Sequence, residues 1–355
     1  MIKMKLTPSL LPCLRRMLFR RRCDNVQNTQ LIMIEGIPGS GKSTTAQLIA
    51  NELRRMGVNH KWWYEEEKGH PVYFYEDYTE IQAIIDDLTN GNYPKVIDNA
   101  LKKWRQFADS VLSSGDVVIV DSCLFGYLTW TLFPFEVPAQ EIEAYVRAVE
   151  QIIKPLNPHV IYYYQADIGA ALAKICTRRA GETEQNFIRA AAESPYGKSR
   201  GLSGFEGLVA YWKGYREITD RAYQRLACTK ISIDNTEGNW PQYARLISDF
   251  LGFDHSDQAP LGEQDDVKHF VGTYQSKTEG IPDCSIRIES GQLIADGLPQ
   301  VWKKSTLIPN SSGVYDVQSL PFQVSFVVVD EGIRMHLTGP ALLDGPVDYR
   351  FVKLG

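Results

Sequence analysis

The sequence predicts an α/β domain with a parallel five-stranded sheet, followed by a small antiparallel β barrel or sandwich. Through most of the chain, short apolar runs alternate with longer amphipathic segments, which is typical of a parallel sheet covered by helices. Near residue 255 this pattern gives way to short strand-like runs separated by turn residues, which indicates an antiparallel β domain. We therefore expect a basic extension at 1–29, an α/β domain at 30–254, a polar linker at 255–266 and a β domain at 267–355.

Five buried strands are expected in the α/β domain, at Leu31–Glu35, Lys61–Glu65, Asp116–Asp121, His159–Tyr164 and Lys230–Asp234. The third of them, DVVIVD, is apolar throughout between its two aspartates, as in a strand that is buried on both faces. Amphipathic spacing predicts helices between and after these strands. They are expected at Ser43–Arg55, Tyr78–Leu88, Asn99–Leu112, Ala139–Ile153, Ile168–Thr177, Glu184–Glu193, Phe205–Leu226 and Trp240–Leu251.

The β domain is expected to contain seven short strands, separated by turn residues. They are Phe270–Tyr274, Cys284–Glu289, Gln292–Ala295, Trp302–Ile308, Gln323–Val329, Arg334–Thr338 and Tyr349–Lys353.

The net charge of −5 is distributed unevenly along the chain. The first 30 residues carry seven basic side chains and one acidic one, which gives +6 and leaves −11 for the rest. An acidic body argues against nucleic acid as the main partner, because phosphate backbones bind basic surfaces. The basic N-terminal segment is interpreted as a flexible extension or an upstream start read into the chain, with a membrane-surface helix or targeting segment as the alternative.

The six cysteines are scattered, and no two have the spacing of a metal-binding or redox pair. This pattern suits a reducing compartment, and we expect a cytoplasmic protein. No apolar run reaches about 18 residues, so no membrane span is expected.

A glycine-rich loop follows the first strand, in the segment LIMIEGIPGSGKST. Gly36, Gly41, Lys42 and Ser43 satisfy the phosphate-loop pattern G-x-x-x-x-G-K-S between a strand and a helix. Glycines permit positive φ angles, so that backbone N–H groups can turn inward around a phosphate at a helix N-terminus. The motif predicts a P-loop NTPase sandwich, in which the sheet lies between two helical layers. The loop is expected to bind ATP together with Mg²⁺. The expected nucleotide-binding residues are Gly36, Pro38, Gly39, Ser40, Gly41, Lys42, Ser43 and Thr44.

A magnesium ion in such a site needs a hydroxyl and a carboxylate. The Ser43 hydroxyl is one expected ligand. Asp121 is the other, because it ends a buried strand. The sequence FVVVDE at 326–331 offers a competing hydrophobic-Asp-Glu pattern. Gly332 follows it within the β domain, so we interpret that segment as a hairpin turn.

Phosphoryl transfer also requires positive charge near the γ-phosphate and a base for the acceptor. Lys42 can reach the β- and γ-phosphates, and Arg178 and Arg179 begin a polar segment that resembles a closing lid. Three glutamates, Glu65–Glu67, follow the second strand at the sheet edge where α/β proteins place ligands, and we take Glu66 as the candidate base. Glu35 is expected to support the loop by hydrogen bonding.

An aromatic cluster surrounds these glutamates, and it either stacks on a flat acceptor or packs in the core. It consists of Trp62, Trp63, Tyr64, Tyr73, Phe74 and Tyr75.

The segment IEGIPGSGKST, Ile34–Thr44, resembles the opening of the thymidylate kinase and deoxynucleoside kinase group of P-loop kinases. The strand ending in Asp121, the Arg178–Arg179 segment and the late strand ending in Asp234–Asn235 are similar in order and spacing. The resemblance covers about residues 30–252. It implies a five-stranded parallel sheet between helices and phosphoryl transfer from ATP.

The resemblance is incomplete on the acceptor side. It implies an Asp/Glu-Arg motif at Asp121, in which the arginine contacts the acceptor, but Ser122 stands in the place of that arginine. Glu65–Glu67 with Pro71 matches the group's Glu-Pro pair only loosely. The tail from Phe270 resembles the small lipocalin-like β domains appended to some bacterial hydrolases, which suggests a binding or dimerising accessory.

Together these features favour an ATP- and Mg²⁺-dependent kinase for a small-molecule hydroxyl or phosphate acceptor, which the resemblance makes nucleoside- or nucleotide-like. The acceptor is expected between Glu65–Tyr75 and Ser122–Trp130. A nucleotide-hydrolysing switch or ATPase is an alternative, although a base-reading N/T-K-x-D motif and a glutamate after Asp121 are both missing. A nucleotide-binding scaffold is the third interpretation. A homodimer is one arrangement that the β domain would allow.

Overall fold

The computed structural model describes residues 28–73, 77–179, 182–253, 267–301, 304–330 and 332–354. Nearly all of the basic extension and the whole predicted linker lie outside these residues, so their interpretations stay predictions. Within the described chain, no helix is both long enough and apolar enough to cross a membrane.

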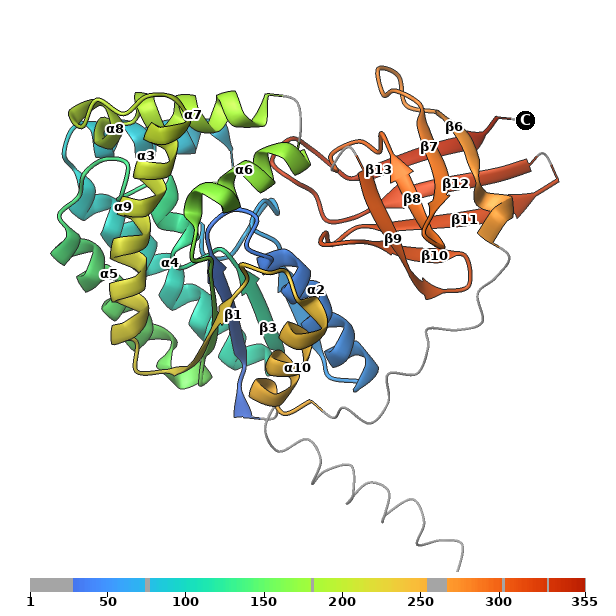
Figure 1. The fold of residues 1–355 in the computed structure, drawn as a ribbon. Coiled ribbons are helices and arrows are strands. Elements are labelled where there is room, and N and C mark those ends of the chain that lie inside the picture. The colour runs from blue at the N-terminus through green and yellow to red at the C-terminus, as the bar shows by residue number, and fades with distance from the viewer. Residues whose placement is uncertain are drawn as a thin grey trace, which may run out of the picture.

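The first part of the chain forms a five-stranded parallel sheet between two layers of helices (Figure 1). Its strands are β1 (Leu31–Gly36), β2 (His60–Trp63), β3 (Val117–Asp121), β4 (His159–Tyr164) and β5 (Thr229–Asp234). They lie in the order β2-β3-β1-β4-β5, so the strand that carries the glycine-rich loop is central. The predicted P-loop sandwich is thereby confirmed.

Successive side chains of β1 point to opposite faces of the sheet, so they contribute to two separate layers of the core. Ile32 and Ile34 pack with α2 (Lys42–Arg55) and α10 (Trp240–Leu251). Leu31 and Met33 belong to the opposite layer. That layer is covered by α4 (Tyr93–Ser114), α5 (Ala139–Ile153) and α9 (Gly204–Arg225). These four side chains and that of Glu35, also in β1, are fully buried, as expected for a central strand of a parallel sheet.

The α/β part contains four further α-helices and two 3₁₀ turns within the described residues (Figure 1). They are α3 (Tyr78–Thr89), the 3₁₀ turn η2 (Gly126–Thr129), η3 (Lys154–Leu156), α6 (Ile168–Arg179), α7 (Thr183–Glu193) and α8 (Pro195–Ser199).

Three differences from the predicted helices exceed one residue at an end. Helix α4 begins at Tyr93, six residues before the predicted start, because Pro94 occupies a first-turn position where its missing N–H costs nothing. The short α8, with a Ser194 cap and Pro195 in its first turn, was missed. Arg178 and Arg179 were expected to follow a helix, whereas they are the last two residues of α6.

The C-terminal part is a closed antiparallel barrel of eight strands preceded by the 3₁₀ turn η5 (Val267–Phe270). The strands are β6 (Gly272–Ser276), β7 (Cys284–Glu289), β8 (Gln292–Asp296), β9 (Lys304–Ser311), β10 (Val314–Val317), β11 (Gln323–Val329), β12 (Gly332–Thr338) and β13 (Asp348–Lys353). Large apolar side chains fill the interior, among them Tyr274, Phe326 and Phe351. The structure thus selects the barrel over the sandwich.

Strand β10, with the sequence VYDV, was missed because four residues are too few for a clear alternation. It pairs with both β9 and β11 and is needed to close the barrel. The competing FVVVDE segment lies where it was predicted. Val329 of β11 pairs with Gly332 of β12 around the turn, so this segment is a hairpin far along the chain from the glycine-rich loop.

The barrel rests on the start of α2. The side-chain amide of Gln47 donates to the backbone carbonyls of Val317 (2.8 Å) and Leu320 (3.0 Å), and its oxygen accepts from the Ser319 backbone N–H (2.9 Å). The hydroxyls of Thr44 and Ser319 are 2.7 Å apart. A second contact joins the Lys68 backbone N–H to the Ala341 carbonyl. The turn between β10 and β11 is therefore held directly beside the glycine-rich loop.

Candidate active site

The glycine-rich loop needs glycine at two positions for steric reasons. Gly36 has φ 151°, and a Cβ there would lie 2.7 Å from the Tyr163 carbonyl oxygen. Gly41 has φ 102° immediately before α2, and a Cβ there would collide with the indole ring of Trp240. The loop is therefore enclosed by β4 on one side and by α10 on the other. Any larger residue at either glycine would displace it.

Polar contacts hold the middle of the loop in place. The Asn235 side-chain amide donates to the Ser40 carbonyl at 2.6 Å, and the Ser40 backbone N–H donates to the Ile37 carbonyl at 3.2 Å. The Lys42 ammonium is buried and donates to the same Ile37 carbonyl at 3.3 Å. Its charge also acts on the buried carboxylates of Glu35 and Asp121. Because its hydrogen bond within the described chain is to a neutral carbonyl, the ammonium can still donate to an anion that enters the loop.

Asp121 lies beside the loop because β3 pairs with β1, so that Asp121 is opposite Ile34. Its carboxylate is fully buried, and Oδ1 accepts from the Trp62 indole N–H at 3.2 Å. Burial, aided by the nearby Glu65 charge, raises its pKa, while Ser43, Trp62 and Lys42 act in the opposite direction. Oδ2 has no hydrogen-bond partner among the described residues. A buried, unpartnered carboxylate oxygen close to the Ser43 hydroxyl fits a hard cation such as Mg²⁺.

The three consecutive glutamates have different environments because β2 ends at Trp63 and the chain turns immediately afterwards. The side chain of Glu67 is buried, and its carboxylate accepts a hydrogen bond from the Lys61 ammonium at 2.6 Å. The backbone of Glu67 forms an isolated antiparallel β-bridge with Leu342 of the C-terminal part. Glu65 is half-buried, and its charge acts on Asp121. Glu66 is exposed at the rim. Glu65 and Glu66 both line the cavity described below, and Glu65 is the one whose charge raises the pKa of Asp121.

Glu35 organises the segment that follows β3. Its carboxylate accepts hydrogen bonds from four consecutive backbone N–H groups, those of residues 123–126, at 2.7–3.3 Å. Burial raises the pKa of Glu35 to about 7, although these N–H groups and Lys42 oppose the shift. Glu35 was expected to support the glycine-rich loop, whereas its hydrogen bonds go to the neighbouring segment.

We expect Glu35→Gln to lower the free energy of unfolding by about 2–3 kcal/mol, because an amide NH₂ would face two of the four buried backbone donors. Urea denaturation followed by circular dichroism measures the change. Glu279→Gln, the same substitution in an exposed turn of the barrel, is the matched control and should change stability by less than about 0.5 kcal/mol. Equal stability of the two variants would contradict the assigned role of Glu35.

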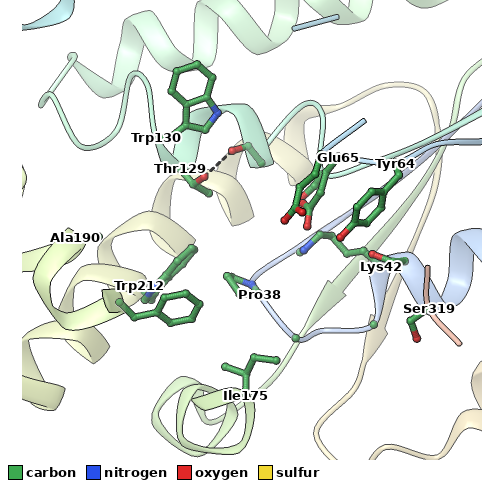
Figure 2. Close-up of a pocket in the computed structure, with 18 of the residues that line it drawn as sticks. Pro38, Lys42, Tyr64, Glu65, Thr129, Trp130, Ile175, Ala190, Trp212 and Ser319 are labelled. Carbon is green, nitrogen blue, oxygen red and sulfur yellow. Dashed lines mark hydrogen bonds between the residues drawn. The ribbon is translucent and has the colours of Figure 1, made fainter. Parts of the chain in front are cut away.

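A cavity of about 400 Å³ opens beside the glycine-rich loop and extends away from it (Figure 2). Its near end is formed by the loop residues, Tyr64, Glu65 and Glu66. Its far end lies between the segment after β3 and helices α7 and α9. The side chains of that end are mainly aromatic: Tyr73, Trp130, Phe187, Tyr211 and Trp212. In Figure 2, Tyr64 and Glu65 lie on the same side of the cavity as Lys42, and Trp212 lies across from them.

The basic residues of the expected lid lie in different places. Arg178 lines the cavity near the loop. Arg179 ends α6, and its side chain lies outside the described residues. Arg200 lies farther along the polar segment that these two arginines begin. It pairs with Glu136 at 2.5 Å, stacks on the Tyr196 ring and does not line the cavity.

The predicted aromatic cluster divides between the cavity and the core. Tyr64 and Tyr73 line the cavity, and the Tyr73 hydroxyl donates to the Ser122 carbonyl at 2.9 Å. Trp62 is buried against Asp121, and Trp63 packs edge-on against His70. Phe74 and Tyr75 lie outside the described residues.

Sequence reasoning missed several residues that the fold brings to the site. Trp240 and Asn235 come from the segment after β5, and Tyr211 and Trp212 come from α9. Ser319 comes from the barrel. The Asp234–Asn235 strand end was noted in the sequence, but nothing local linked it to the loop. Ser319 carried no signal at all, because its position depends on how the barrel docks.

Comparison with known proteins gives one family match. A family model described as an AAA domain matches residues 32–152, which include the glycine-rich loop and Asp121. No curated protein matches the chain. The solved structure of the YorR protein of Bacillus subtilis in complex with phosphorylated GDP is 16% identical and covers 64% of this chain and 99% of that chain. Its TM-score is 0.33.

Proposed function

We propose that this protein is a kinase that transfers the γ-phosphoryl group of ATP to a hydroxyl group of a small, flat, uncharged molecule, in the presence of Mg²⁺. The observation that supports this best is that one continuous cavity joins the glycine-rich loop to an aromatic chamber and has Glu65 in its lining. A hydrolase needs only room for water beyond the γ-phosphate. A chamber lined by five aromatic rings suits an organic acceptor instead.

The donor end of the site is assigned from its charges. Gly36–Thr44 would hold the phosphates through backbone N–H groups at the start of α2. Lys42 would bind the β- and γ-phosphates, and Arg178 would stabilise negative charge as the phosphoryl group moves. Ser43 and Asp121 would hold the magnesium ion, which neutralises charge on the phosphate oxygens when it is bound.

The acceptor end of the site favours a neutral molecule. Among the described residues that line it, none is lysine or arginine. Ser122 occupies the place where the resembling kinases carry an arginine on the acceptor side. A phosphorylated acceptor would need such a cation, whereas a nucleoside or another flat polyol could stack between aromatic rings without it. The acceptor is therefore proposed to be nucleoside-like rather than nucleotide-like.

Glu65 is proposed as the base in place of Glu66. The acceptor O–H bond breaks as its oxygen bonds to the γ-phosphorus, the proton passes to the Glu65 carboxylate, and ADP leaves with the electrons of the broken P–O bond. Glu65 is half-buried, lines the cavity and lies on the same side of it as Lys42 (Figure 2), so it is near the place where the γ-phosphate would meet a hydroxyl. Glu66 is exposed to water, so it is less suited to select one proton.

The decisive experiment measures ADP release from ATP with and without acceptors, using the full chain. A panel pairs each nucleoside with its own 5′-monophosphate and adds sugars and hydroxylated antibiotics. We expect one or more nucleoside-like compounds to raise ADP release at least about tenfold, with a product heavier by one phosphoryl group in mass spectra.

The same measurement identifies the alternatives. Equal release of ADP and free phosphate, whatever the acceptor, would indicate a nucleotide-hydrolysing switch or ATPase. ATP binding without turnover across the panel would indicate a scaffold. A preference for monophosphates over their nucleosides would contradict the neutral acceptor. Chelation of Mg²⁺ by EDTA should remove all turnover, and added MgCl₂ should restore it.

A further inference from the structure

A second cavity, of about 290 Å³, lies between the α/β sandwich and the barrel. From the sandwich it is lined by Thr44, Arg178 and Trp240. Its opposite wall belongs to the barrel and consists of Lys304, Ser305 and Thr306 of β9 with Gln318 and Ser319 of the following turn. Nothing in the glycine-rich loop motif accounts for this wall.

The two cavities meet at the loop, because Thr44, Arg178 and Ser319 line both of them. A nucleoside triphosphate held by a glycine-rich loop has its γ-phosphate toward the lysine and the metal ligands. Here Lys42, Ser43 and Glu65 all line the first cavity, which also contains the proposed acceptor chamber. The nucleoside must therefore leave the loop in another direction. The passage beside Thr44 leads into the second cavity.

We propose that the barrel forms one wall of the pocket for the nucleoside part of the ATP donor, and that Thr306 and Gln318 hydrogen-bond to its base or ribose. This inference rests on the proposed function and adds the barrel to the same site. The β domain, interpreted from sequence as a separate accessory, would then be part of the nucleotide site.

The chemistry of the two walls is complementary to a nucleoside. On the sandwich side, Trp240 is an aromatic ring seated on Gly41, and Arg178 carries a planar guanidinium, both of which can pack against a base or its phosphates. On the barrel side, the side chains offer hydroxyl, amide and ammonium groups. Bases and ribose present several donors and acceptors along their edges, so a polar wall opposite a flat one matches this ligand.

The barrel wall is held rigidly enough to act as a binding surface. Gln47 makes three hydrogen bonds to the turn that carries Gln318 and Ser319. Ser319 is buried and has φ 64°, so the turn has a defined, uncommon backbone conformation. The Gln318 backbone N–H donates to the Thr306 carbonyl at 2.9 Å, which keeps both residues side by side. The Lys304 ammonium is 3.4 Å from Glu289 on the neighbouring surface.

The test compares two ligands and two double variants of the full chain by calorimetric titration with Mg²⁺ present. ATP would occupy the loop and the second cavity, whereas inorganic tripolyphosphate would occupy the loop alone. The variant Thr306→Ala with Gln318→Ala removes the polar wall. The matched control, Thr273→Ala with Gln275→Ala, removes the same two side-chain types from exposed positions of β6.

We expect the wall variant to bind ATP about tenfold more weakly than the unaltered protein, since two hydrogen bonds to the nucleoside are lost. Tripolyphosphate binding should stay within about twofold, and the control variant should match the unaltered protein for both ligands. Thermal denaturation of each variant establishes that it is folded.

Two results would overturn the inference while leaving the proposed kinase intact. One is unchanged ATP affinity in the wall variant. The other is an equal loss of affinity for ATP and tripolyphosphate, which would place the effect on the loop. If the unaltered protein binds neither ligand, the proposed function itself is wrong, and the inference fails with it.

Discussion

Replacing Lys42 by alanine is expected to reduce phosphoryl transfer by at least about 1,000-fold, while the protein stays folded. The ammonium would be the main cation on the β- and γ-phosphates, and removing a preorganised charge of this kind from a transition state costs at least that much in rate. The fold should tolerate the change, because the hydrogen bond that the ammonium makes within the described chain is a single contact with the Ile37 carbonyl, at 3.3 Å. Initial rates of product formation with saturating acceptor measure the loss.

The control for this prediction is Lys102→Ala, which removes the same side chain from the exposed face of α4. It should keep the rate of the unaltered protein. Circular dichroism spectra of both variants should overlay that of the parent. Full turnover by Lys42→Ala would mean that the glycine-rich loop does not carry the chemistry, and the proposed function would have to be abandoned.

The second large effect is expected from Glu65→Gln, which should lower kcat by about 100- to 10,000-fold, the usual contribution of a positioned general base. The amide keeps the shape of the side chain but cannot accept the acceptor proton. Glu66→Gln is the matched control one residue away, at the exposed rim of the same cavity. It should change kcat by less than about threefold.

These two variants distinguish the base directly. If Glu66→Gln lost the activity and Glu65→Gln kept it, the base would be the residue chosen from sequence. The KM for the acceptor adds information, because a residue that only binds the acceptor would raise KM and leave kcat unchanged. A loss in kcat alone supports proton transfer at Glu65.

Local patterns were sufficient for much of the α/β fold. One strand and two helices have the predicted bounds, because their apolar spacing is regular and their ends carry turn residues. They are the strand His159–Tyr164 and the helices Ala139–Ile153 and Trp240–Leu251. Asp121 was identified from its place at the end of a buried strand, and β3 does pair with β1. Weaker patterns gave poorer results, as at the short β10 and α8.

Contacts between distant segments were beyond the reach of these patterns. The sequence offered three adjacent glutamates, and no local feature supported the choice of Glu66 among them. Only the turn after β2 buries Glu67 against Lys61, leaves Glu66 exposed and places Glu65 near Asp121. Similarly, Glu35 stands next to the glycine-rich loop in sequence but is directed toward residues 123–126 by the pairing of β1 with β3.

The sequence by itself determined that this protein has a phosphate-binding loop between a buried strand and a helix, because that geometry depends on a few neighbouring glycines and on periodic burial. The tertiary structure decided what surrounds the loop. Trp240 reaches Gly41 from about 200 residues away, and Ser319 reaches Thr44 across 275 residues. Such contacts arise when packed layers and a closed barrel bring segments together, and no local spacing of residues records them.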